Sequence, residues 1–235
     1  MRLMIELDSK NYLSIENSIG HMIQGFIYDN LKNSFFSYLH NINGTKYFSF
    51  SLPFIYKEKI YIIISSPVSE IIDILYKKIN INRRIILGKF TFIVNNIKKF
   101  NLTIKSNITI NTATPIIIRI KKPDYEKYKS VYWKSGDDPV LFVTQLQTNL
   151  VKKYQNFYDI KFEYNYNLFN SFKFIKQVSS VTEIKKKNII FIGSLWEFKI
   201  GYIDSAMADF LRFSLDTGFG EMNSLGYGFC NIEKN

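Results

Sequence analysis

The chain has 235 residues, of which 46% are hydrophobic and 22% charged, a balance that favours a folded protein with one or two cores over a disordered one. Thirty-one Lys and Arg residues against twenty Asp and Glu residues give a net charge of +11, which favours a polyanionic partner. A single cysteine, Cys230, excludes an intramolecular disulfide and a cysteine-based metal cluster.

The first half of the chain alternates between strand and helix patterns. MRLMIEL at the start alternates apolar and polar side chains as a half-buried strand does, and the helical segments carry Ile and Leu at three- and four-residue spacing. The patterns predict, in chain order, strand 1–7, helix 15–31, strands 47–56 and 59–65, helix 69–79 and strand 85–94. This βαββαβ order predicts a ferredoxin-like domain, an antiparallel sheet with both helices on one face.

The second half repeats this order less regularly after a charged junction at 98–107. The patterns predict strands around 108–120, helix 138–154, a hairpin of 169–184 and 188–202, helix 203–216 and a final strand. The predicted fold class is therefore α+β, with two tandem ferredoxin-like domains at residues 1–102 and 103–235. Similarity between the two halves is not visible in the residues, so this prediction rests on element order.

No segment of the sequence has the pattern of a membrane-spanning or membrane-binding element. The longest apolar runs fall short of the about 18 residues that a spanning helix needs, and the start of the chain is strand-like rather than a signal peptide. An anionic membrane surface would require an amphipathic helix with a clustered basic face, and no segment shows one clearly. We therefore expect a cytoplasmic protein whose polyanionic partner is a nucleic acid.

Glycine is concentrated in one segment near the end, DTGFGEMNSLGYGF at 216–229, which holds four of the eleven glycines. Gly218, and with it Gly220, fits the end of the preceding helix, where a left-handed backbone is common. Gly226 and Gly228 have two interpretations: a hairpin without a ligand, or backbone kept free of side chains so that phosphates can approach. Because the segment follows a helix and opens a strand, it does not fit a Rossmann or Walker loop.

The pattern GFGEMNSLGYG resembles the C-terminal glycine-rich signature of the repeat-associated RNA-binding superfamily of CRISPR systems. Within that superfamily the whole chain is similar to the endoribonucleases that process pre-crRNA, and TPIIIR at 114–119 resembles the segment that opens their second domain. The five intervening residues, EMNSL, begin with Glu221 and lack the Lys or Arg that the family usually carries. The resemblance thus implies that RNA lies against the backbone at Gly226 and Gly228, with nearby basic residues contributing.

The reaction that the resemblance implies needs neither a metal nor another cofactor. A ribose 2′-hydroxyl attacks the adjacent phosphodiester and leaves a 2′,3′-cyclic phosphate and a 5′-hydroxyl. Two protons must move and a negative phosphorane must be stabilised. Histidine suits the proton transfers because its ordinary pKa of about 6.5 is near neutrality, and lysine and tyrosine supply charge and hydrogen bonds.

His40 is the first catalytic candidate. It lies after the first helix in YLHNINGTKYFSFS, with Lys46 six residues further on and Tyr47 next to it. This resembles the family's histidine, lysine and serine-ended strand, and implies His40 as general acid or base, with Lys46 or Tyr47 stabilising the phosphorane. Without the resemblance, a turn histidine with no catalytic role is the more frequent case.

The first helix offers two further candidates. The family often uses a tyrosine from this helix, and Tyr28 is the natural one. His21 precedes Tyr28 by seven residues, so both lie on one helix face with Gly25 between them. Since a helix histidine on a mixed face is more often a surface residue, catalysis by His40 alone and catalysis with His21 both stay open.

Clusters of basic residues are the candidate RNA-binding surface, because single-stranded RNA is bound by aromatic stacking beside positive charge. Such clusters can equally be solvated turns or helix ends. The candidates are Lys185, Lys186 and Lys187 in the hairpin turn, Arg83 and Arg84 before a strand, and Lys152 and Lys153 in a helix.

Three functions remain as hypotheses. The first is a metal-independent endoribonuclease that cleaves CRISPR repeat RNA within pre-crRNA, which the His40–Lys46–Tyr47 turn favours. The second is a non-catalytic RNA-binding subunit of a CRISPR effector complex, and the third is a basic α+β domain with another partner. The resemblance also implies a homodimer as one arrangement to test.

Overall fold

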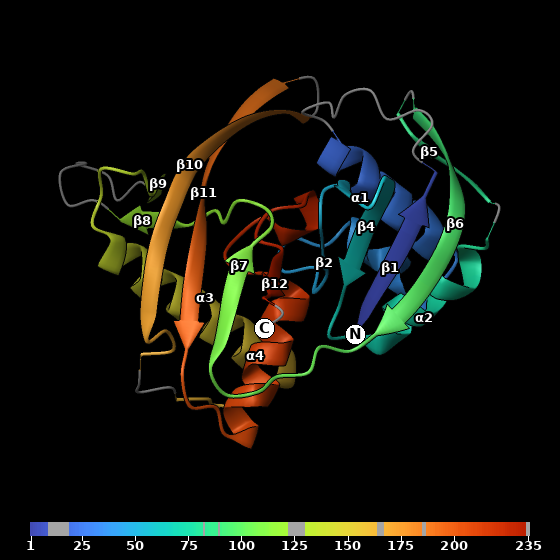
Figure 1. Ribbon diagram of the computed structural model, residues 1–235. Coiled ribbons are helices and arrows are strands. Elements are labelled where there is room, and N and C mark those ends of the chain that lie inside the picture. The colour runs from blue at the N-terminus through green and yellow to red at the C-terminus, as the bar shows by residue number, and fades with distance from the viewer. Residues whose placement is uncertain are drawn as a thin grey trace.

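The computed structural model describes residues 1–8, 19–81, 83–88, 90–121, 130–163, 167–184 and 187–233. In this part of the chain two α+β halves follow one another, and each half has an antiparallel sheet covered on one face by two helices (Figure 1). The predicted fold class, two tandem ferredoxin-like domains, is confirmed.

The first half is built around β1, which lies in the middle of its sheet. The sheet order is β2-β4-β1-β6-β5, and β1 pairs antiparallel with both neighbours, so that Ile5 is opposite Ile62 on one side and Ile97 on the other. The elements are β1 (Arg2–Leu7), α1 (Ile19–Leu31), η1 (Phe35–His40), β2 (Ser49–Phe50), β3 (Phe54–Tyr56), β4 (Lys59–Ser65), α2 (Ser69–Lys78), β5 (Arg84–Leu87) and β6 (Phe90–Phe100).

Regular apolar spacing explains why α1 and α2 lie on this sheet. In α1 a buried apolar residue recurs every fourth position, and in α2 the buried positions are again one helical stripe. Each such side chain contributes about 1.5–3 kcal/mol when fully buried. The side chains that meet in this first core include Ile19, Ile23, Ile27 and Leu31 of α1, Ile71, Ile72 and Leu75 of α2, and Leu3, Ile5 and Leu7 of β1.

The second half has the sheet order β10-β11-β7-β12, which is the same ferredoxin-like arrangement. Asp138 caps α3 by accepting a hydrogen bond from the Val140 amide at 2.8 Å, and Pro139 occupies the first helical position. The elements are β7 (Ile108–Thr112), β8 (Arg119–Lys121), β9 (Ser130–Tyr132), α3 (Pro139–Tyr158), β10 (Ser171–Ile184), β11 (Lys187–Ile200), α4 (Ser205–Thr217), η2 (Asn223–Leu225) and β12 (Cys230–Ile232).

Two elements differ from the sequence prediction. The predicted strand 85–94 is a hairpin, β5 and β6, with Gly88 in the turn at φ +60°. β6 then continues through the charged residues to Phe100, because its backbone pairs with β1 along this whole stretch. The junction is accordingly shorter than predicted, and the predicted domain boundary at 102/103 falls inside it and stays a prediction.

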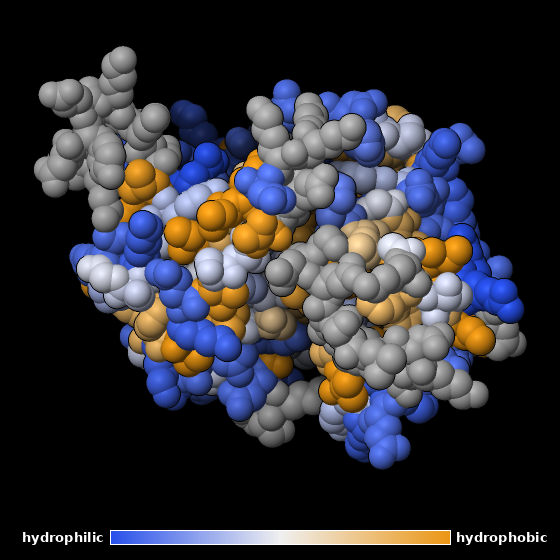
Figure 2. Space-filling model, turned by 90° about the horizontal axis from the view of Figure 1, so that it is seen from above, coloured by the Kyte–Doolittle hydropathy of each residue, from blue (hydrophilic) through white to orange (hydrophobic). Residues whose placement is uncertain are grey.

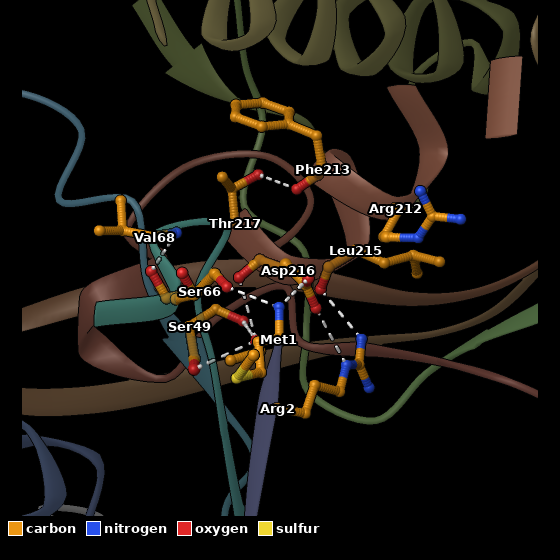
Figure 3. A network of polar contacts seen from close by, with 12 residues as sticks. Met1, Arg2, Ser49, Ser66, Val68, Arg212, Phe213, Leu215, Asp216 and Thr217 are labelled. Atoms are coloured by element: carbon orange, nitrogen blue, oxygen red, sulfur yellow. Dashed lines mark hydrogen bonds and ion pairs between the residues drawn. The ribbon is translucent and has the colours of Figure 1, made fainter. Parts of the chain in front are cut away.

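A buried ionic network joins the two halves (Figure 3). The Arg2 guanidinium of β1 is fully buried and lies 3.4 Å from the carboxylate of Asp216 in α4, and it donates to the Leu215 carbonyl at 3.0 Å. It also donates to the Cys230 carbonyl at 2.9 Å, while Ser65 of β4 donates to the Asp216 carbonyl at 3.0 Å. Because these contacts hold the end of α4 against β1 and β4, they fix where the following glycine segment, residues 216–229, begins.

The upper face of the molecule carries apolar patches between hydrophilic side chains (Figure 2). The hairpin of β10 and β11 extends toward this face (Figure 1), and its outer part exposes Val181, Ile189 and Ile190. Of the helices in the described ranges, none has both the length and the apolar character needed to cross a membrane.

Candidate active site

His40 is brought back against the first helix by a short capped turn. Ser34 caps η1 by accepting a hydrogen bond from the Phe36 amide at 3.2 Å, and His40 is the last residue of η1. The imidazole of His40 then meets the ring of Tyr28 in α1 edge-on, with ring centroids 5.1 Å apart. Its Nδ1 lies 2.9 Å from Oδ1 of Asn41. The result is an exposed imidazole whose orientation is restricted on one side by Tyr28.

Lys46 closes the loop that carries His40. Its ammonium donates to the Leu39 carbonyl at 2.6 Å and also to the Ile42 carbonyl. Partial burial lowers the pKa of Lys46 below its ordinary value. Since an ammonium has three donors, one of them is left for a ligand.

Tyr47 has a role in joining the two halves. Its backbone is left-handed, with φ +52°, and its ring lies 4.9 Å from Phe157 of α3 and 6.3 Å from Phe213 of α4, measured between ring centroids. Burial raises the pKa of the Tyr47 hydroxyl. This packing was not foreseen from the sequence, and the role of Tyr47 toward a phosphorane stays a prediction.

Tyr28 connects His40 to the glycine segment. Its hydroxyl lies close to the side chains of Ser224 in η2 and Gln24 in α1, within reach for hydrogen bonding, and Gln24 in turn donates to Ser224 Oγ at 3.4 Å. Burial raises the pKa of Tyr28, and hydrogen bonding to these two side chains partly opposes that shift. Sequence reasoning missed both partners. Gln24 could have been found from its four-residue spacing to Tyr28, whereas only membership in the glycine segment singled out Ser224.

His21 is exposed at the start of α1, beside a close contact with the glycine segment. A Cβ atom on the preceding residue, Gly20, would lie 2.6 Å from the Leu225 carbonyl oxygen. The first turn of α1 therefore rests directly on η2. His21 stays a catalytic alternative to His40.

The four glycines of the segment are buried, and their φ angles lie between +69° and +89°. A side chain at Gly226 would meet the Phe50 ring at 2.8 Å, and one at Gly228 would coincide with the Phe219 carbonyl oxygen. The protein's own atoms thus fill the space that a side chain would need at Gly226 and Gly228, and contact of RNA with these two glycines stays a prediction. RNA contact by Gly218 and Gly220, which are equally buried, stays a prediction.

Lys153 holds the glycine segment from inside. Its side chain is buried, and its ammonium donates to the Gly218 carbonyl at 2.9 Å, to Asn223 Oδ1 at 2.6 Å and to the Gly220 carbonyl. Burial lowers the pKa of Lys153 to about 7. This corrects the expectation that Lys153 belongs to a surface pair that binds RNA: its three donors are used within the protein, and only Lys152 is exposed.

The remaining basic candidates are distributed over the surface. Arg83 precedes β5 and Arg84 is its first residue; both are exposed, and Arg83 donates to Asn30 Oδ1 at 3.1 Å and to the Lys78 carbonyl. Their contact with RNA stays a prediction, as does that of Lys152. The predicted cluster in the hairpin turn is not covered in full: Lys185, Lys186 and the side chain of Lys187 lie outside the described residues.

A cleft of about 390 Å³ separates the loop after His40 from the glycine segment. Gly44, Thr45 and Lys46 form one wall, and residues 220–224 form the other. Arg119 of β8 reaches this cleft and pairs with Glu221 at 2.6 Å. Within the described ranges, no three His, Cys, Asp or Glu side chains come together in a way that could hold a metal ion.

Comparison with known proteins identifies the family. The model of the family "CRISPR associated protein Cas6, C-terminal" matches residues 94–232. CRISPR-associated endoribonuclease Cas6 2 of Methanocaldococcus jannaschii is 35% identical, with 98% of this chain and 99% of that protein covered. The Cas6 endoribonuclease of Pyrococcus furiosus is 25% identical, with coverage of 100% and 91%.

Solved structures give the same result for the fold. A structure described as CRISPR associated protein Cas6 superposes with a TM-score of 0.69 at 24% identity, over 100% of this chain and 99% of that one. A Cas6-related protein from Pyrococcus furiosus reaches a TM-score of 0.73 at 22% identity, with the same coverage. The family match over more than half of the chain, together with the full-length relative, shows that this chain belongs to the Cas6 family of CRISPR-associated endoribonucleases.

Proposed function

We propose that the chain cleaves CRISPR repeat RNA within pre-crRNA by general acid–base catalysis that needs no metal ion. Its family supports RNA cleavage in CRISPR RNA processing. The finer chemistry is supported by one observation: the exposed imidazole of His40 lies against Tyr28, whose hydroxyl is within hydrogen-bonding reach of Ser224 in the glycine segment.

In the proposed reaction the ribose 2′-hydroxyl gives its proton to a base, and O2′ forms a bond to the adjacent phosphorus. The bond from phosphorus to O5′ then breaks, and O5′ receives a proton. The products are a 2′,3′-cyclic phosphate and a 5′-hydroxyl. His40 serves as the base or the acid, because its exposed ring can approach either oxygen and imidazole exchanges protons near neutral pH.

Tyr28 and Lys46 supply the stabilisation of negative charge. The raised pKa of Tyr28 keeps its hydroxyl protonated, so that it acts as a neutral hydrogen-bond donor. Lys46 contributes the donor that its loop carbonyls leave free. His21 is the alternative source of a proton, since it lies one helical turn before Gln24 on the same face of α1.

The division of labour between the halves is part of the proposal. Residues 1–102 carry the catalytic side chains, and residues 103–235 carry the glycine segment that completes the site. The RNA substrate would put the protein in the cytoplasm. Association into a homodimer or a CRISPR effector complex is tested by sedimentation of the purified protein with and without repeat RNA.

The test uses the purified chain and end-labelled repeat RNA in EDTA. We expect cleavage without added metal, products ending in a cyclic phosphate, and no cleavage when the scissile nucleotide carries a 2′-deoxy sugar. Cleavage of the deoxy substrate, or a requirement for magnesium, would contradict the proposed chemistry. Binding that leaves the RNA intact would instead support the non-catalytic RNA-binding subunit.

A further inference from the structure

The cleft beside the candidate active site has two walls that are far apart in the sequence. One wall is the turn at Gly44–Lys46, which follows His40, and the other is the part of the glycine segment that contains Ser224, the partner of Tyr28. A ligand in this cleft therefore lies next to Lys46 and Ser224, which flank the candidate site.

The charged side chains that line the cleft are mostly cationic. The cations among the lining residues are Lys46, Arg119 and Lys153, and the one carboxylate among them is that of Glu221. Lys153 has all three of its donors on protein acceptors, and Lys46 has two of its donors on carbonyls. Arg119 is the most available of the three, since 48% of its side chain is exposed. The cleft thus has a positive lining in which Arg119 is the cationic side chain most accessible to an anion.

Glu221 orients Arg119 without using up its donors. The carboxylate receives Nε and Nη2 of the guanidinium at 2.6 Å, and its other oxygen receives the Arg119 backbone amide at 3.2 Å. Glu221 is itself fixed, because its amide donates to the Ile117 carbonyl at 2.9 Å. A guanidinium has five N–H donors, so after two bonds to Glu221 it keeps donors for a second oxyanion.

We propose that Arg119, held in place by Glu221, binds a backbone phosphate of the RNA in this cleft, next to the nucleotide that is cleaved. The planar guanidinium suits the non-bridging oxygens of a phosphate, which it can contact in a bidentate manner. This phosphate subsite rests on the proposed function. The five residues between the two glycine pairs, EMNSL, have no Lys or Arg, and Arg119 would supply the basic contact that they lack.

The test measures RNA binding by Arg119→Met in the His40→Ala protein, so that the RNA stays intact during the measurement. The probe is the fluorescently labelled repeat RNA in EDTA, titrated at several salt concentrations. We expect binding to weaken by about tenfold and the slope of log K against log[salt] to fall by about 0.7, the value for one phosphate contact on a single strand.

Arg212→Met is the matched control. Arg212 is also a half-exposed arginine in an ion pair, 2.6 Å from Asp209, but it lies in α4 and does not line the cleft. Both variants lose the same net charge, so a difference between them reports a local contact. Arg119→Lys, which keeps the charge and loses the planar fork, should bind with intermediate affinity, and thermal melting confirms that each variant is folded.

Equal affinity and equal salt slope for the Arg119→Met and Arg212→Met proteins would overturn the subsite. Failure of the proposed function would be seen in a different assay. The wild-type protein would then leave the repeat RNA intact in EDTA, regardless of the RNA affinity of the Arg119 variants. The two results are therefore distinguishable.

Discussion

Lys153 is a charged residue in the interior whose partners are neutral oxygens. Its ammonium is held by two glycine-segment carbonyls and by Asn223, and Asn223 in turn donates to the Phe219 and Tyr227 carbonyls at 2.9 and 3.0 Å. The segment is thus tied together from its centre. Because η2 carries Ser224 to Tyr28, an ammonium in the second half helps to position the candidate site.

Replacing Lys153 by Met should destabilise the protein by about 2–5 kcal/mol, because it leaves three buried acceptors unsatisfied at about 1–3 kcal/mol each, partly relieved by relaxation. The measurement is urea unfolding. Lys152→Met is the matched control, since it changes the same residue type at the next, exposed position and should stay within about 0.5 kcal/mol of wild type. Equal losses for the two variants would contradict a central role for Lys153.

The pH dependence of unfolding follows from the same residue. The pKa of Lys153 is about 7 in the folded protein and 10.5 ordinarily, with Glu221 and Cys230 opposing the lowering by burial. Between pH 7 and pH 10.5, Lys153 is protonated in the unfolded chain and neutral in the folded protein, so its contribution makes the unfolding free energy rise with pH. Below about pH 7 it is protonated in both states, and its contribution no longer depends on pH. Wild type should gain stability relative to Lys153→Met between pH 7 and pH 10.5, and parallel pH curves would contradict it.

Short-range partners at the site could be anticipated from the sequence, whereas long-range ones could not. Lys46 closes a loop of a few residues around His40, and Gln24 is one helical turn from Tyr28. Tyr28 lies in the first half of the chain and Ser224 in the second, and only the packing of the two halves brings them together. A single sequence carries no local signal for such a contact.

At the scale of elements, the prediction of helices and strands succeeded where one side of the element is regularly apolar. It missed the turn in 85–94, because an apolar run on both sides of Gly88 has the same pattern as one strand. It also ended β6 too early, since pairing with β1 overrides the weak strand preference of charged residues there. A glycine in the sequence indicates that a side chain is missing at that position. It does not indicate whether a ligand or the protein's own atoms occupy the space beside the backbone.

The glycine segment gives the prediction at this scale. Gly228→Ala should destabilise the protein by more than about 2 kcal/mol, because the backbone is left-handed and the new methyl group collides with the Phe219 carbonyl. Gly25→Ala in α1 is the control, since no atom lies within 4 Å of its Cβ position, and it should gain about 0.5–1 kcal/mol in helix propensity. Thermal unfolding compares them, and a tolerated Gly228→Ala would show that the segment is open.

For the whole molecule, the meeting of the two halves depends on a buried charge that the sequence does not reveal. Arg2 lies in an alternating strand, where a charged residue ordinarily faces solvent, yet it is buried against Asp216. The net charge of +11 favoured a nucleic acid as the partner, and membership in a family of endoribonucleases agrees with that class of partner. Electrostatic reasoning thus succeeded for the surface as a whole and failed for this single buried residue.

Asp216→Asn should cost about 3–5 kcal/mol, because it leaves the Arg2 cation buried without its carboxylate. Asp209→Asn removes a carboxylate from an exposed pair with Arg212 and should cost at most about 1 kcal/mol. Urea unfolding of both variants measures the difference. Similar small losses would mean that the ionic network contributes little to joining the halves.

The central claim is that His40 performs the proton transfer at a site completed by both halves. Its most direct test is the single-turnover rate of repeat-RNA cleavage in EDTA for His40→Ala, with His21→Ala as the second histidine variant. We expect His40→Ala to lose about 10²- to 10⁴-fold in rate while binding RNA as wild type does, and His21→Ala to lose far less. Wild-type cleavage by His40→Ala, or a loss confined to His21→Ala, would contradict the assignment.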